Sequence, residues 1–150
     1  MSSAFRVGVA GLGTVGAGVL RLLRDNAELI TARAGRPITV TAVSARNRRS
    51  DRGISLDGVQ WHDDPVGLAT DPAVDVVVEL IGGSDGPARA LVEAALTAGR
   101  PVVTANKALV AVHGTALAAV SERSGAALAF EAACCRPSTS WTLPTSMPAC

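Results

Sequence analysis

Short apolar segments alternate with longer segments of helical periodicity along most of this 150-residue chain. Residues 5–10 (FRVGVA), 38–45 (ITVTAVSA) and 74–83 (VDVVVELIGG) are apolar or β-branched runs of the kind found in buried parallel strands. Two shorter runs, PVVTAN at 101–106 and AALAFEA at 126–132, resemble them. The pattern therefore predicts five strands.

The intervals between these runs predict helices and loops. From residue 14 to about residue 33, apolar side chains recur at helical spacing opposite a charged face. Pro87 suits the first position of a second helix, which Gly99 closes, and a third helix is expected from about 114 to 124. The remaining segments are an exposed basic loop at 46–60 and one short helical turn within 64–72.

Strands that alternate with helices are typical of an α/β protein. The order strand, helix, strand, strand, helix, strand, helix, strand predicts a Rossmann-type doubly wound parallel sheet with helices on both faces. We expect this domain to occupy residues 1–133. Residues 134–150 (CCRPSTSWTLPTSMPAC) are rich in proline, serine and threonine without a periodic apolar face, so we expect a disordered tail.

Composition narrows the class of protein. The net charge is +1 and only four residues are aromatic, which disfavours binding to nucleic acid or to an anionic membrane. No apolar run approaches the roughly 18 residues of a transmembrane helix, and the amino-terminal segment is a poor secretion signal. Two of the three cysteines are adjacent and one is terminal, so no disulfide framework is implied. These features predict a cytoplasmic protein.

The segment VAGLGTVGAG contains Gly11, Gly13 and Gly16 in the spacing G-x-G-x-x-G, between a predicted strand and a predicted helix. In that context the first glycine permits a tight turn, the second lets the backbone approach a diphosphate, and the third lets the helix pack on the strand. The helix amino terminus then offers N–H groups to phosphate. The sequence predicts a dinucleotide site here, and the alternative is a turn selected only for packing.

The end of the second strand indicates which dinucleotide is preferred. NAD enzymes of this fold usually carry an acidic residue there for the ribose 2′-hydroxyl group. Here the strand continues into SARNRR, with Arg46, Arg48 and Arg49 and no acid. A guanidinium can pair with a 2′-phosphate through two hydrogen bonds. We expect Arg46 to contact phosphate and the other two arginines to lie in a solvated loop, so NADP is predicted over NAD, with NAD as the alternative.

Four segments in order closely resemble the nucleotide-binding half of homoserine dehydrogenase. They are GVAGLGTVGAGV (8–19), VDVVVELIGG (74–83), VVTANKALVAVHG (102–114) and LAFEAA (128–133), and the similarity runs from about residue 5 to 133. The resemblance implies an oxidoreductase that interconverts homoserine and aspartate semialdehyde with NAD(P)H, in threonine, methionine and isoleucine biosynthesis. It also implies a homodimer.

The resemblance also implies roles for individual residues. Lys107, in TANK, would lie at the cofactor and substrate site and act in catalysis, and its position after a parallel strand suits that role. The alternative is an ordinary solvated lysine. Asn106 is expected to fix the turn before a helix, and His62 and His113 to be structural or exposed. The expected cofactor-binding residues are Gly11, Leu12, Gly13, Thr14, Val15, Gly16, Ala17, Gly18, Arg46, Gly82, Gly83, Thr104 and Lys107.

By the same resemblance, Glu131 would help to hold a monovalent cation such as sodium, together with backbone carbonyl groups just downstream. A carboxylate oxygen suits such a hard cation. The downstream residues depart from the family pattern, which continues into a second domain that carries the substrate-binding acids. We therefore hypothesise that the chain is truncated by a shift of reading frame, and that alone it binds cofactor with little turnover.

Two other functions remain open. One is a non-catalytic NADP-binding module that senses the cofactor or docks on a partner. The other is a different semialdehyde dehydrogenase with a nucleophilic cysteine, which Cys134 or Cys135 could supply. A reactive cysteine commonly needs a neighbouring histidine or helix terminus, and no histidine follows this pair. The cysteine context therefore disfavours the second alternative.

Overall fold

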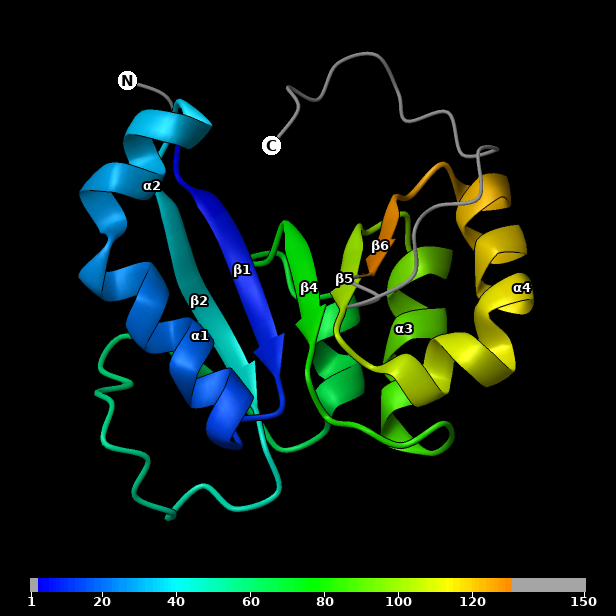
Figure 1. Ribbon diagram of the computed structural model, residues 1–150, viewed down its shortest axis with the longest axis horizontal. Helices are drawn as coiled ribbons and strands as arrows, with labels where there is room; N and C mark the ends of the chain where they lie inside the picture. Colours follow the sequence, from blue (N-terminus) through cyan, green and yellow to red (C-terminus); the bar gives the residue numbers. More distant parts are fainter. Residues whose placement is uncertain (1–2, 131–150) are drawn as a thin grey trace.

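The computed structural model describes residues 3–130, which form a six-stranded parallel sheet with helices on both faces (Figure 1). The strands lie in the order β3-β2-β1-β4-β5-β6, so the chain builds outward from β1 in one direction and from β4 in the other. All neighbouring strands pair in parallel. The strands are β1 (Phe5–Ala10), β2 (Ile38–Ser44), β3 (Gln60–His62), β4 (Val76–Glu79), β5 (Val102–Thr104) and β6 (Leu128–Phe130).

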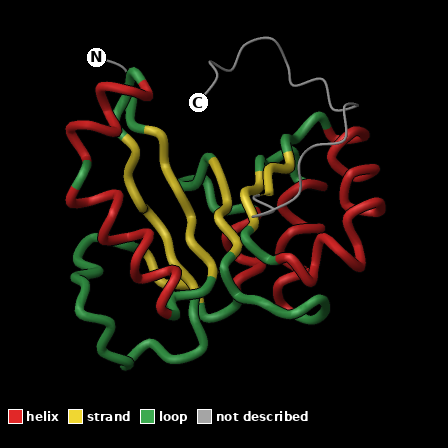
Figure 2. The backbone as a smooth tube through the Cα atoms, viewed as in Figure 1, coloured by secondary structure: helices red, strands yellow, loops and turns green. Residues whose placement is uncertain are grey.

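The helices divide between the two faces of the sheet, and Figure 2 shows the sheet running between the two helical layers. One layer holds the first two helices, and the other holds the last two together with a short 3-10 helix. The helices are α1 (Thr14–Asp25), α2 (Ala27–Ala34), η1 (Pro65–Ala69), α3 (Pro87–Thr97) and α4 (Lys107–Ser124). The expected doubly wound architecture and the short helical turn are confirmed.

Each face of the sheet has its own apolar core. Val9, Leu20 and Val43 belong to the core beneath α1, whereas Val77 and Leu91 belong to the core beneath α3 and α4. Because helices cover both faces of the sheet, the central strands consist of consecutive apolar residues instead of alternating apolar and polar ones. Among residues 3–130, no helix is long and apolar enough to cross a membrane.

Two helix predictions were wrong in their bounds. The helix expected from residue 14 to 33 is interrupted at Asn26, whose side-chain amide donates to the Leu22 carbonyl oxygen at 3.0 Å and competes with the helical pattern. The helix expected from residue 114 begins at Lys107 instead. Its first turns give only a weak helical pattern in the sequence. They contain two valines, and one of these, Val112, is an apolar side chain that is 63% exposed.

The strand predictions also needed correction. β3 was not predicted, and it begins at the last residue of the loop expected at 46–60. Three residues are too short for a periodic signal, and pairing with β2 holds them in place. β4 covers only Val76–Glu79 of the expected 74–83, and the positive φ values of Gly82 and Gly83 are incompatible with a continued strand. The proposed domain boundary at Ala133 and the tail at 134–150 lie outside the described residues.

Candidate functional site

The turn between β1 and α1 brings the three glycines of the fingerprint together. Gly11 has φ +95, and a Cβ atom there would lie 2.5 Å from the Leu80 carbonyl oxygen. A Cβ atom on Gly16 would collide with the Gly11 carbonyl oxygen, so the expected close packing of helix on strand is confirmed. A Cβ atom on Gly13 would meet nothing within 4 Å, so this backbone is open to a ligand.

The amino terminus of α1 faces outward beside this turn. Gly13 is its N-cap, and no side chain of the described residues caps the helix there. The first N–H groups of a helix have no intrahelical partners, and they carry a partial positive charge. Open backbone at Gly13 and free N–H groups make this a place where an anion can bind.

Two adjacent hollows flank the turn. One is a cleft of about 350 Å³ between the ends of β1, β2 and β4, and the other, of about 410 Å³, lies along the first turns of α1. Of the expected cofactor-binding residues, Gly11, Leu12, Gly13 and Arg46 line the cleft, and Leu12, Gly13, Thr14, Ala17 and Gly18 line the second hollow. The other expected residues line neither hollow: Val15, Gly16, Gly82, Gly83, Thr104 and Lys107. Val15 is 61% exposed, and Gly16 is buried against the turn.

Arg52 holds the loop after β2 against the glycine turn, and sequence reasoning missed it. Its Nε donates to the Leu12 carbonyl oxygen at 3.0 Å, and its Nη1 donates to that of Ser50 at 2.7 Å. A third hydrogen bond runs from its Nη2 to the Asn47 carbonyl oxygen. The guanidinium therefore joins both walls of the cleft. Arginine in a basic loop is the only sequence signal for this, since the bond to Leu12 spans 40 residues.

The end of β4 is organised by the fully buried carboxyl group of Glu79. It accepts hydrogen bonds from the N–H groups of Ile81 at 2.7 Å and Gly82 at 3.3 Å, and from the Thr104 hydroxyl group at 2.6 Å. Thr104 is itself 1% exposed. The predicted cofactor residue Thr104 therefore uses its side chain within the protein, and it supports the exposed backbone at Gly82 and Gly83.

Lys107 is the first residue of α4 and is exposed. Asn106 precedes it as the N-cap, and its side-chain oxygen accepts from the Leu109 N–H at 3.1 Å while its amide donates to the Gly83 carbonyl oxygen at 2.7 Å. The expectation that Asn106 fixes the turn is confirmed. These contacts hold the start of α4 at the same edge of the sheet as the β1–α1 turn and the loop after β4 (Figure 1).

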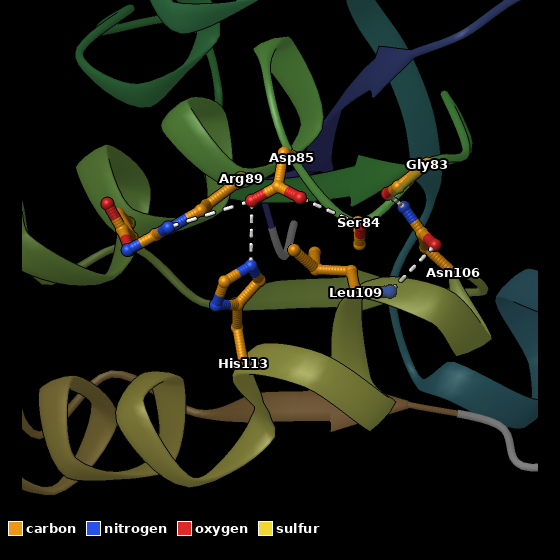
Figure 3. Close-up of polar contacts among 8 residues, drawn as sticks. Gly83, Ser84, Asp85, Arg89, Asn106, Leu109 and His113 are labelled. Carbon is orange, nitrogen blue, oxygen red and sulfur yellow. Dashed lines mark hydrogen bonds and ion pairs between the residues drawn. The ribbon is translucent and has the colours of Figure 1, made fainter.

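The two histidines each pair with an aspartate. His62 Nε2 lies 2.7 Å from Asp71, whose side chain is almost completely buried, which agrees with a structural role. His113 Nε2 lies 2.9 Å from Asp85 Oδ1 in the loop after β4 (Figure 3). Hydrogen bonds from Ser84 and then from His113 lower the pKa of Asp85. Sequence reasoning missed this pair because 28 residues separate its members.

Glu131, the expected cation ligand, lies outside the described residues. Within residues 3–130, the His, Cys, Asp and Glu side chains form no group of three that could hold a metal ion.

The doubly wound parallel sheet and the glycine turn between β1 and α1 together define a dinucleotide-binding domain. The turn lies at the point where the strand order reverses, which is where such sheets bind dinucleotides. The family described as "Homoserine dehydrogenase, NAD binding domain" matches residues 11–131. The chain therefore belongs to the homoserine dehydrogenase family, and the matched residues correspond to the NAD-binding domain of that family. This family differs from the cysteine-dependent semialdehyde dehydrogenases considered above.

Individual relatives agree with this assignment. Homoserine dehydrogenase of Pseudomonas aeruginosa is 47% identical over 130 residues, which are 85% of this chain and 29% of that protein. The crystal structure of a homoserine dehydrogenase from Thiobacillus denitrificans superposes with a TM-score of 0.79 at 45% identity, covering 86% of this chain and 30% of that one. The S. aureus enzyme at pH 7.0 gives a TM-score of 0.78 at 29% identity, covering 87% and 33%. The chain thus spans about a third or less of the length of these relatives.

Proposed function

We propose that this chain binds NADP(H) and supplies the cofactor site for interconversion of homoserine and aspartate semialdehyde. The observation that carries the proposal is the uncapped amino terminus of α1 beside the open backbone of Gly13. Residues Gly11 to Gly18 would hold the cofactor diphosphate there. Because free N–H groups and the helix dipole both favour negative charge, this position suits phosphate better than any neutral ligand.

The rest of the cofactor would extend to both sides of this point. In a doubly wound sheet the two halves of a dinucleotide lie over the two halves of the sheet. The adenosine half would lie at the end of β2, where Arg46 lines the cleft. The nicotinamide half would lie over the ends of β4 and β5, beside Gly82, Gly83 and Lys107. Thr104 would act through Glu79, which holds the backbone of Ile81 and Gly82.

NADP is proposed over NAD because of the charge at the end of β2. Arg46 lines the cleft, and β2 ends at Ser44 without an acidic residue to bind a ribose 2′-hydroxyl group. A charged hydrogen bond of about 1.5–3 kcal/mol corresponds to a preference of about 10- to 150-fold.

A nicotinamide held at this site would supply or accept the hydride. We propose that the ammonium group of Lys107 orients polar groups at the site and stabilises negative charge on the substrate carbonyl oxygen. Glu131 would contribute to a sodium site. The substrates are the small molecules homoserine and aspartate semialdehyde, and the expected assembly is a homodimer. The 150-residue chain alone should show little turnover, since hydride transfer requires a substrate held in reactive geometry.

Isothermal titration of the chain with NADPH and NADH tests the proposal. NADPH should bind at least about 10-fold more tightly, and Arg46→Ala should abolish that difference while leaving NADH affinity unchanged. Arg49→Ala is the matched control, because Arg49 is exposed in the same loop and lines neither hollow. Equal affinities for the two cofactors would refute the NADP preference, and absence of binding to either would refute the proposed function.

A further inference from the structure

The loop that connects β4 to α3, residues 80–86, is held from one side by α4. The Asn106 amide donates to the Gly83 carbonyl oxygen at 2.7 Å, and His113 Nε2 lies 2.9 Å from Asp85 Oδ1. The two side chains are seven residues apart, which places them two turns apart on the same face of a helix. Figure 3 shows them reaching the loop from the same helix. We call these two contacts the α4 brace.

The loop itself is poorly constrained by its sequence. The φ values of Gly82, Gly83 and Gly86 are +87, +81 and +74. Glycine adopts positive and negative φ about equally readily, so these residues do not by themselves fix the backbone. Glu79 fixes the first part of the loop through Ile81 and Gly82. Beyond Gly82, side chains reach the loop from two helices: Arg89 of α3 pairs with Asp85, and the α4 brace contacts both Gly83 and Asp85.

His113 lies in a polar environment that includes a carboxylate and a guanidinium group. Asp85 faces it from the loop, and Arg89 faces the same carboxylate from α3, with its Nη1 at 3.7 Å from Asp85 Oδ1. The Arg89 side chain also contacts Glu93, since Arg89 Nε donates to Glu93 Oε1 at 2.8 Å. The Ser84 hydroxyl group donates to the other Asp85 oxygen at 2.9 Å. The His113 side chain is only 15% exposed, whereas that of Asp85 is 67% exposed, so the imidazole is the anchored member of the pair.

We propose that His113 is a positioning residue for the nicotinamide half of the cofactor. Through Asp85 it holds the loop 80–86 at a fixed place relative to the amino end of α4, where Lys107 lies. This inference rests on the proposed function, because it takes the nicotinamide to lie over β4 and β5. His113 touches neither cofactor nor substrate in this role. Its effect is to keep the exposed backbone of Gly82 and Gly83 in the conformation that the nicotinamide half meets.

A comparison of two ligands separates this role from a general structural one. NADPH spans both halves of the site, whereas adenosine 2′,5′-bisphosphate occupies only the adenosine half and the phosphate region. His113→Leu removes the hydrogen bond and should weaken NADPH about 3- to 10-fold while leaving the bisphosphate affinity unchanged. His113→Gln keeps an N–H donor near the position of Nε2, so it should remain within about 2-fold of the unsubstituted chain for both ligands.

Two further variants complete the design. Asp85→Ala removes the same contact by changing its exposed partner, so no buried side chain is lost. It should give the same selective loss of NADPH affinity. Val112→Gln is the control on the same helix, since Val112 is 63% exposed, and it should change neither affinity.

The outcomes distinguish this inference from the proposed function. If His113→Leu and Asp85→Ala leave NADPH affinity unchanged, or weaken both ligands equally, the positioning role is refuted and the proposed function stands. If His113→Gln is as damaging as His113→Leu, the hydrogen bond is not the cause and the inference also fails. If the unsubstituted chain binds neither ligand, the proposed function is wrong and the inference fails with it.

Discussion

Glu79 shows how one buried polar residue can determine the shape of a binding edge. Its carboxyl group is 0% exposed and accepts three hydrogen bonds, from Ile81 and Gly82 after β4 and from Thr104 at the end of β5. A buried polar group is tolerated when its hydrogen-bonding capacity is satisfied. Glu79 therefore ties two neighbouring strand ends together just below the exposed glycines of the loop.

Replacing Glu79 with glutamine should destabilise the chain by about 1–3 kcal/mol, because an amide N–H₂ group in place of one oxygen deprives a buried donor of its acceptor. Urea denaturation followed by circular dichroism measures the change in the free energy of unfolding. Glu122→Gln, on the exposed surface of α4, is the control and should change that free energy by less than about 0.5 kcal/mol. Equal stability of the two variants would contradict the role assigned to the buried carboxyl group.

Helix α4 connects the stability of an element to the geometry of the site. Its N-cap, Asn106, uses both ends of one amide group. The oxygen accepts from the Leu109 N–H, which stabilises the helix, and the nitrogen donates to the Gly83 carbonyl oxygen, which places the loop after β4. The two tasks can be separated by substitution because aspartate keeps the acceptor and loses the donor.

Asn106→Ala should reduce stability by about 1 kcal/mol and weaken NADPH binding as well. Asn106→Asp keeps the oxygen that accepts from the Leu109 N–H and so retains the helix cap, but it sets a second oxygen against the Gly83 carbonyl oxygen and should still weaken NADPH binding several-fold. Thermal denaturation and NADPH titration of both variants measure these effects. An aspartate variant with unchanged NADPH affinity would show that the contact to Gly83 does not contribute to the site.

At the scale of the whole domain, the sheet of residues 3–130 has two halves that meet where β1 pairs with β4. Apart from this pairing, an ion pair joins the halves at the opposite edge from the glycine turn. Arg6 Nη2 lies 2.7 Å from Asp75 Oδ1, and its Nε and backbone N–H also donate to Asp75 Oδ2, at 3.0 and 2.8 Å. Hydrogen bonds from the Arg6 side chain and backbone lower the pKa of Asp75 from 3.8 to about 2.

This lowered pKa makes the stability of the fold depend on pH in a defined range. Because the carboxylate is favoured in the folded state, its contribution is fully present above pH 3.8 and is lost as the pH falls through about 2. Asp75→Asn should lose about 1 kcal/mol at pH 7, a small value because the pair is partly exposed, and should lack this component of acid destabilisation. Urea denaturation of both chains between pH 2 and pH 7 tests this, and parallel profiles would contradict it.

Much of the fold could be predicted from the sequence because its signals are local. The apolar runs of β1 and β4 and the spacing of Gly11, Gly13 and Gly16 depend on residues adjacent in the chain. β3 could not be predicted, because only pairing with β2 holds three residues extended. The start of α4 was missed because burial of its early turns depends on the sheet and on α3, which a local pattern does not contain.

By itself, the sequence determined the doubly wound class, the position of the glycine turn and the family, since each follows from the order and spacing of residues along the chain. Only the tertiary structure decided that Arg52 joins the two walls of the cleft, that Glu79 turns inward, and that His113 meets Asp85. The physical reason is distance in sequence. Contacts between residues far apart in the chain exist only after the strands pair and the helices pack, so no local pattern encodes them.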